Sequence, residues 1–492
     1  MENSKLSEHD LIKGVFRSKF SQMMTPLDKD EDWAHAKAPE YVWLALILCN
    51  GDREIQLQKC LSILKEMHEK MPEGSMELLT MTTIMNLTDD LKNYFIETIH
   101  NNGVMDDLSP LSIVMDEKIR FLKNEMRAYR YTLLERIEKL NTVLEEISNH
   151  QSQISTDIRY LIIYQISLRG NFKVMSDSGI IEDLNDYPFL DVEDERMRHI
   201  RPMIRSTELG ISQTFGGKSG INYEFSSYFW KEFGRYTDCE VFAVDFAEEK
   251  VDLTPLKNEI YKILEYYKDL IQNLEQNDQK LFVLVGILTY SYKRLLELTD
   301  HNLQQTISGR SIVRSVVENY MMTKYLLKNE GKHKDIWEEY QYYGIGNYKL
   351  IFERYREETP NIENSHIQFQ YLDLLSSEYI NKEFIEMDTR YFGNGNIRNK
   401  FKEVDEDFLY KYLYEYDSQF EHGLWGAIRE SSILKCNSPG HQFHGVPDID
   451  NVQKMSDVGN DIINVMERHI EVIQVAYPIP FLTSQEEERF ER

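Results

Sequence analysis

The chain has 492 residues, of which 41% are hydrophobic and 28% are charged, as in a globular protein with two to four domains. Its net charge of −27 argues against a general nucleic-acid binder, which needs a basic surface, although a local basic cleft remains compatible with it. Because the acidic residues are spread evenly, we interpret them as a solubilising surface rather than as a binding tract for a basic partner.

The cysteines and the longest apolar stretches indicate the cellular compartment in which the protein is expected. The four cysteines are scattered and form no C-x-x-C pair, which fits a reducing cytosol. The N-terminal sequence MENSKLSEHDLIKGVF lacks the apolar core of a signal peptide. The runs VWLALILC and FVLVGILTY are too short to span a bilayer. We therefore predict a cytoplasmic protein of bacterial type, with no membrane partner and no cofactor.

The first third of the chain is predicted to be helical. Only 12 prolines occur, and long stretches are rich in Glu, Lys, Leu and Ile, which favours an all-α fold. Helices are expected over 38–48, 57–71 and 76–101. Over 115–166 apolar residues recur three or four positions apart, which indicates a long helical hairpin. These elements make a first domain, 1–169.

The rest of the chain is predicted to form a connecting segment and a second lobe. Residues 170–250 contain many turn-forming Gly, Asp, Asn and Pro residues, so we expect an irregular segment with one short strand at CEVFAVDF. Residues 251–492 form the second predicted domain, a helical bundle. Its expected helices are 255–274, 281–298, 307–327, 408–434 and 451–476.

The helix predicted over 307–327 combines an apolar surface with charges. Arg310, Arg314 and Glu318 are four residues apart, so they lie on one side of a helix. A helix that is apolar nearly all round is buried, and buried charges must be paired or line a cleft. The pattern therefore predicts a polar site inside the bundle. A simpler interpretation is that Arg314 and Glu318 form an i,i+4 ion pair that only stabilises the bundle.

The second half of the candidate site lies in YKYLYEYDSQFEHGLWGAIRESS. On a continuous helix Ser418, His422 and Arg429 share one face, together with Glu415, Gln419 and Gly426. Glycines beside His422 would let a ligand approach, and an imidazole suits acid–base catalysis near neutral pH. Arginines hold phosphates well. The alternative is a core histidine with no catalytic task.

A metal site is a further alternative. Cys436, His441 and His444 share one loop, and His422 lies upstream. Cysteine and histidine bind zinc, but C-x4-H-x2-H is not a standard zinc spacing. We therefore predict no metal and interpret the loop as a surface turn.

A family resemblance can be stated on these motifs. Residues 255–475 resemble a bacterial helical family of unknown function that carries R-x-x-x-E on one helix and Y-x-S-x-x-x-H-G on a later one. Here the motifs are Arg314 to Glu318 and Tyr416 to Gly423. More distantly, that family is similar to the HEPN superfamily of helical ribonucleases, many of which act in toxin–antitoxin or phage-defence systems.

The resemblance implies an RNA-cleaving site. The HEPN signature has an arginine four to six residues before its histidine, whereas Glu415, Tyr416 and Asp417 precede His422. The arginine must then be Arg310, Arg314 or Arg429. We expect His422, Arg314, Glu318 and Arg310 to be catalytic, and Ser418 and Arg429 to bind substrate.

Two hypotheses follow from these observations. The first is a defence-type effector, a metal-independent ribonuclease whose partner is RNA or a phage or host protein. The second is a non-catalytic interaction or sensor protein that binds a partner through its acidic helical surface. In either case we expect a homo-oligomer.

Overall fold

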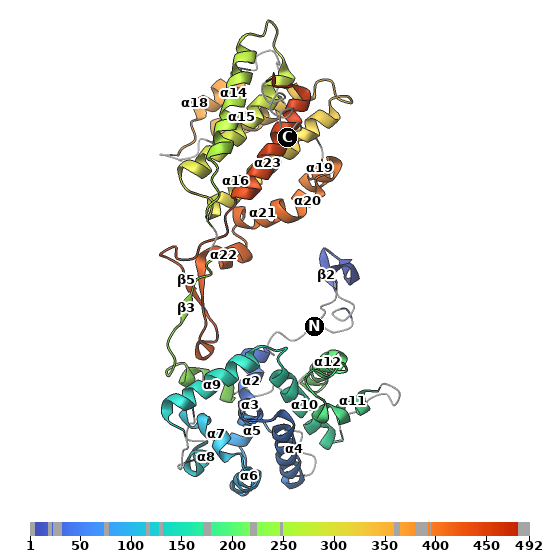
Figure 1. Ribbon diagram of the computed structural model, residues 1–492, viewed down its shortest axis with the longest axis vertical. Helices are drawn as coiled ribbons and strands as arrows, with labels where there is room; N and C mark the ends of the chain where they lie inside the picture. The colour runs from blue at the N-terminus through green and yellow to red at the C-terminus, as the bar shows by residue number, and fades with distance from the viewer. Residues whose placement is uncertain are drawn as a thin grey trace, which may run out of the picture. The chain divides into compact units, whose positions relative to one another are not determined.

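The computed structural model describes residues 5–17, 22, 32–72, 78–114, 119–126, 131–170, 179–216, 224–246, 249–358, 365–378, 392–393 and 395–480. They are predominantly helical with two small sheets, which confirms the all-α prediction. The chain divides into two compact units (Figure 1). The first contains Met1–Phe242 and Lys435–Gly445, and the second contains Ala243–Leu434 and Val446–Arg492.

This division differs from the predicted one at the central segment. Within 170–250 the structure has helices α11 (Ile180–Asp186), α12 (Met197–Gly216) and α13 (Glu224–Phe233). Phe225, Phe229 and Phe233 of α13 are fully buried in the core of the first unit, so this stretch is part of that unit rather than an irregular connection. Residues 171–178, 217–223 and 247–248 lie outside the described part.

The first unit is a set of mostly short helices around one apolar core, with a small hairpin of strands β1 and β2. Its remaining elements are η1 (Leu6–Glu8), β1 (Asp10–Ile12), β2 (Val15–Arg17), η2 (Trp33–Lys37), α2 (Ala38–Glu40), α3 (Val42–Leu48), α4 (Arg53–Lys70), α5 (Met81–Met85), α6 (Asp89–Asn101), α7 (Met105–Leu108), η3 (Ser109–Ile113), α8 (Arg120–Glu125), α9 (Leu133–Ser148), α10 (Gln153–Leu168), η5 (Tyr187–Phe189), β3 (Val241–Phe242) and η7 (Pro439–His441).

The predicted hairpin over 115–166 is built from three helices rather than two long ones. Thr132 and Ser152 cap the N-termini of α9 and α10, each accepting a hydrogen bond from the amide three residues on. Asn149, at the end of α9, has an extended conformation that ends the helix. Two 16-residue helices therefore pack together here, with the short α8 before them.

Buried ion pairs hold α10 in the first core. Asp157 is fully buried and accepts hydrogen bonds from Arg53 at 2.7 Å and from the Tyr187 hydroxyl at 2.6 Å. Two residues on, Arg159 donates to Glu208 at 3.0 Å. Burying these charges is tolerated because each has a partner of opposite charge or a hydrogen-bond donor. These buried ion pairs therefore stabilise the core of the first unit, and we do not assign a binding site to them.

The second unit packs helices around a separate core, with α16 at its centre. Helix α16 lies against α15, α21 and α23 (Figure 1). The elements are α14 (Thr254–Gln272), α15 (Gln279–Asp300), α16 (Ile307–Asn329), α17 (Ile336–Glu358), α18 (Phe369–Ser377), α19 (Ile397–Glu403), α20 (Asp407–Leu409), η6 (Tyr410–Tyr414), α21 (Glu415–Glu421), α22 (Trp425–Ser432) and α23 (Gly459–Ala476). Strands β4 (Ile433–Cys436) and β5 (Gly445–Pro447) lie at the boundary of the units, because Lys435–Gly445 belongs to the first unit.

A small sheet with the order β3-β4-β5 joins segments that are far apart in the sequence. Strands β3 and β4 are antiparallel, with Val241 opposite Cys436 and Phe242 opposite Lys435. The strand predicted at CEVFAVDF is thus present as β3. Across the described residues, no helix combines the length and the apolar character that a membrane span requires.

Candidate functional site

Helix α16 positions the predicted charges as the spacing indicated. Thr306 caps its N-terminus by accepting a hydrogen bond from the Gly309 amide. Arg310 is only 1% exposed, and its guanidinium donates to the backbone carbonyls of Gln304 at 3.2 Å and Ser456 at 2.7 Å. Its charge therefore ties the start of α16 to the segment before α23. Arg310 is not open to solvent.

Arg314 is the centre of a polar cluster. Its Nε donates to Ser418 Oγ at 3.0 Å and its Nη2 donates to Tyr414 Oη at 2.7 Å. Its Nη1 lies 3.5 Å from a carboxylate oxygen of Glu318. The side chains of Arg314 and Glu318 are 21% and 24% exposed, so both reach the surface. We call Arg314, Glu318, Tyr414 and Ser418 the arginine cluster.

The tyrosine of this cluster comes from an unusual turn. Residues Tyr410–Tyr414 form η6, a π-helical turn that runs directly into α21. Such turns insert an extra residue into a helix and are frequent at functional sites. Tyr414 Oη lies between the two charges, 2.7 Å from Arg314 and 3.4 Å from Glu318, and burial raises its pKa to about 12. The hydroxyl is therefore neutral near pH 7.

Asp417 lies beside the cluster on α21. It is 4% exposed, and burial raises the pKa of its carboxyl to about 8. The positive charges of Arg310 and Arg314 act in the opposite direction, while Asp461 adds to the rise. Burial outweighs the arginines because removing a carboxylate from water is costly. Asp417 is therefore a carboxylic acid that keeps its proton near neutral pH.

The structure places His422 at the end of α21, with its side chain exposed. The Gly423 amide bonds to the Phe420 carbonyl, the Leu424 amide bonds to the Gln419 carbonyl, and Gly423 has φ +57°. This is a Schellman motif, which ends a helix with a left-handed residue. Gly423 thus terminates α21, and its left-handed conformation explains why glycine occupies this position.

The break after His422 separates the other predicted residues. Arg429 belongs to α22, where it donates to the Ile433 carbonyl at 2.7 Å. The single helical face that we predicted from Glu415 to Arg429 is therefore wrong, because the chain turns between α21 and α22. Ser418 joins Arg314, whereas Arg429 caps its own helix.

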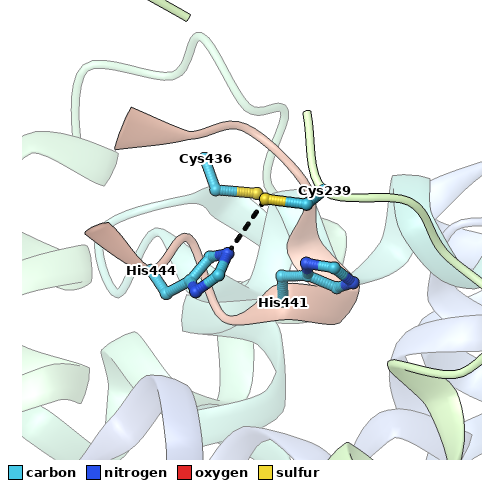
Figure 2. A group of neighbouring side chains, drawn as sticks. All are labelled: Cys239, Cys436, His441 and His444. Atoms are coloured by element: carbon cyan, nitrogen blue, oxygen red, sulfur yellow. Dashed lines mark hydrogen bonds between the residues drawn. The ribbon is translucent and has the colours of Figure 1, made fainter. Parts of the chain in front are cut away.

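The cysteine and histidine residues of the late loop converge with a residue from much earlier in the chain. One ligand atom from each of Cys239, Cys436, His441 and His444 lies within 4.8 Å of the others (Figure 2). Cys239, rather than His422, completes the set that the sequence suggested in part. All four residues belong to the first unit.

Sequence reasoning missed Tyr414, Asp417 and Cys239. Tyr414 had a local signal, since it precedes Ser418 by one helical turn. Asp417 had none, because its importance comes from burial by other helices. Cys239 lies 205 residues before His444, and no spacing rule links residues that far apart.

The comparisons with known proteins bear on most of the second unit and on the start of the segment 435–445. Residues 281–441, which are 161 of the 492, match a family of unknown function named DUF5677. A likeness to a family of unknown function is thus confirmed, over a shorter range than the predicted 255–475, whereas no comparison supports the motifs or the similarity to HEPN proteins. The matched stretch contains the whole arginine cluster and His422. No curated protein and no solved structure matches the chain.

Proposed function

We propose that the second unit carries a metal-independent ribonuclease site of a defence-type effector, centred on Arg314. The observation that carries the proposal is the partly exposed guanidinium of Arg314, held in orientation by Ser418 and Tyr414. A fixed arginine suits phosphate binding because its planar donors match the phosphate oxygens. The choice of RNA as substrate rests on the more distant similarity of the unknown-function family to HEPN ribonucleases, whose arginine-before-histidine signature is missing at His422.

The chemistry assigned to this site is internal transesterification. The imidazole of His422 takes the proton of a ribose 2′-hydroxyl, and the 2′-oxygen attacks the adjacent phosphorus. The bond to the 5′-oxygen breaks, and that oxygen takes a proton from water. Arg314 neutralises the charge that develops on the phosphorane, and Glu318 holds the guanidinium in place. The products end in a 2′,3′-cyclic phosphate and a 5′-hydroxyl.

The test follows these product ends. Wild-type protein and His422→Ala are produced in a bacterium, and total RNA is sequenced by a method that captures cyclic-phosphate ends. His366→Ala is the matched control, because His366 is another exposed histidine of the second unit. We expect new ends with the wild type and the control but not with His422→Ala. Identical ends with all three proteins would overturn the proposal. So would cleavage of purified RNA by the purified wild type that is lost when EDTA is added.

A second candidate is a non-catalytic interaction or sensor protein. It is favoured by the saturation of Arg314, since Nε, Nη1 and Nη2 each already face a protein group. In this case the cluster only fixes α21 and η6 against α16. The acidic surface then binds the partner. RNA ends would be unchanged by Arg314→Ala, whereas the stability of the second unit would fall.

Three further expectations are kept as proposals. They are an RNA, phage-protein or host-protein partner, assembly into a homo-oligomer, and a cytoplasmic location. Sedimentation of the purified chain tests the assembly, and a monomer at micromolar concentration would contradict it.

A further inference from the structure

We propose that Cys239, Cys436, His441 and His444 bind one zinc ion in the first unit. Two thiols and two imidazoles are a complete ligand set for tetrahedral zinc. With Zn–S of about 2.3 Å and Zn–N of about 2.0 Å, a tetrahedron places its ligand atoms about 3.3–3.8 Å apart. Here the four atoms lie within 4.8 Å of one another, and Cys239 Sγ is 3.2 Å from His444 Nε2 (Figure 2).

The backbone brings the four residues together without help from a metal. Strand pairing sets Val241 opposite Cys436, and the Asn437 amide donates to the Glu240 carbonyl at 2.8 Å, so Cys239 runs beside the start of the loop. The Cys436 amide donates to the His444 carbonyl at 2.9 Å, which closes the loop on itself. His441 and His444 of this loop therefore lie close to Cys436, the residue with which the loop begins.

The loop is also tightly seated on its own unit. Helix η7 packs against α9 and α13. A Cβ on Gly440 would lie 2.3 Å from Thr237 Oγ1 and 3.1 Å from a ring carbon of Phe233, so only glycine fits there. Gln442 and Phe443 have φ of 56° and 50°, a left-handed conformation that is costly for side chains of this size. A bound ion offers a source of stabilisation for this strained turn.

Hydrogen bonds around the ligands match those of known metal sites. His441 Nε2 lies 2.9 Å from the Thr237 carbonyl, which leaves Nδ1 to bind the ion. A ligating histidine usually donates its other ring N–H to such an acceptor. The Ser438 amide donates to Cys436 Sγ at 3.4 Å, which stabilises a thiolate. These contacts distinguish the group from four residues that are merely close.

The ligand set indicates a structural ion. Four protein ligands fill a tetrahedral zinc and leave no position for water or substrate. Cys436 is fully buried, whereas Cys239 and His444 are exposed, so the ion lies at the surface, where a chelator can reach it. Its task would be to fasten the late segment 435–445 to the rest of the first unit. This inference does not depend on the proposed ribonuclease.

The experiment measures zinc in the full-length chain, purified under reducing conditions with its affinity tag removed. We expect one equivalent of zinc by mass spectrometry of the metal content. Cys436→Ser and His441→Ala should lose it. Cys49→Ser and His150→Ala are matched controls from the same unit and should keep it, because both residues are exposed and outside the cluster.

Replacing zinc by cobalt keeps the test decisive if a ligand variant fails to fold. Cobalt bound to the wild type should give the strong visible bands of a tetrahedral site and the near-ultraviolet bands of cobalt–thiolate bonds. The proposal is overturned if the reduced wild type takes up neither zinc nor cobalt. It is equally overturned if Cys239 and Cys436 are joined as a disulfide that persists in reductant, or if the ligand variants keep the full zinc content.

Discussion

Arg314 shows how a single side chain joins two helices. Its donors reach Ser418 and Tyr414, which belong to α21 and η6, while its own helix is α16. Lysine keeps the charge but offers one compact donor group in place of the planar fork. We expect Arg314→Lys to lower the stability of the second unit by about 1–2 kcal/mol, because two hydrogen bonds cannot both be made. Denaturant unfolding measures the change.

The matched control for this substitution is Arg356→Lys. Arg356 is an exposed arginine of α17 that contacts Glu353 three residues before it. Exposed pairs contribute little, so stability should not change measurably. Equal losses in the two variants would show that the hydrogen bonds of Arg314 carry no special weight.

Asp417 makes the second unit sensitive to pH. Because its pKa is raised to about 8, the folded chain keeps a proton that the unfolded chain releases near pH 4. Stability therefore falls as pH rises from about 4 to about 8. Asparagine has the same shape and no charge to bury. We expect the melting temperature of Asp417→Asn to exceed that of the wild type by an amount that grows over this pH range.

The exposed Asp450 provides the comparison for that experiment. Asp450→Asn should follow the wild-type melting curve at each pH. If the curves of Asp417→Asn and the wild type run parallel, the buried carboxyl does not titrate as proposed.

At the residue scale, the sequence was enough to predict which neighbouring side chains on one helix contact each other. It was not enough to predict the environment that other helices provide. The i,i+4 spacing of Arg314 and Glu318 was enough to predict their contact, which the structure has at 3.5 Å. Ser418, which was predicted to bind substrate, accepts a hydrogen bond from Arg314, and its role in binding stays a prediction. The position of His422 could not be derived, because it depends on where α21 ends and on which helix follows. Its catalytic role stays a prediction.

At the scale of the elements, the first turn of helix α16 packs closely against the backbone of the segment before it. A Cβ on Gly309 would lie 2.4 Å from the Leu303 carbonyl oxygen and 3.3 Å from that of Gln304. These are backbone atoms and cannot rotate away. We expect Gly309→Ala to destabilise the second unit by about 1–3 kcal/mol through displacement of the helix start. Thermal unfolding followed by circular dichroism measures the loss.

Gly286 supplies the control within the neighbouring helix α15. A Cβ there meets nothing within 4 Å, and the residue is exposed. Alanine favours a helix interior over glycine by about 0.5–1 kcal/mol, so Gly286→Ala should be neutral or stabilising. If both alanine variants behave alike, the close approach at Gly309 is not a constraint.

Helices with clear caps were predicted well, and helices ended by other signals were not. The predicted range 307–327 compares with Ile307–Asn329 in the structure, because Thr306 is an N-cap and the apolar pattern is long. The predicted helix 408–434 breaks at Gly423, and its last residues form strand β4. The glycine was a readable stop signal. The strand was not, since its partner Val241 lies in a distant segment.

On the scale of the whole molecule, the described residues contain two large and separate apolar cores, one in each unit. One contains Trp43, Ile47 and Phe229, and the other contains Tyr267, Val316 and Met466. Length indicated two to four domains, and the pattern of elements along the chain indicated two lobes. The exact division could not be predicted, because the short segment 435–445 joins the first unit from a late position in the chain.

Separate cores predict separate unfolding events. Ile47 is fully buried in the first unit, and Ile47→Ala should cost about 2–5 kcal/mol there. Scanning calorimetry of the full chain should resolve two transitions. Ile47→Ala should shift one of them, and Gly309→Ala should shift the other. A single transition that moves equally in both variants would show that the units unfold together.

The discontinuity of the first unit has a consequence for biosynthesis. A ribosome that has made Phe242 must still make Ala243–Leu434 before the segment 435–445 exists. At translation rates of about 5–20 residues per second, that interval lasts roughly 10–40 s. During this interval Cys239 has been made, whereas Cys436, His441 and His444 have not yet been added. For much of its synthesis the nascent chain therefore carries the Cys239 thiol without the three side chains that lie beside it in the finished protein.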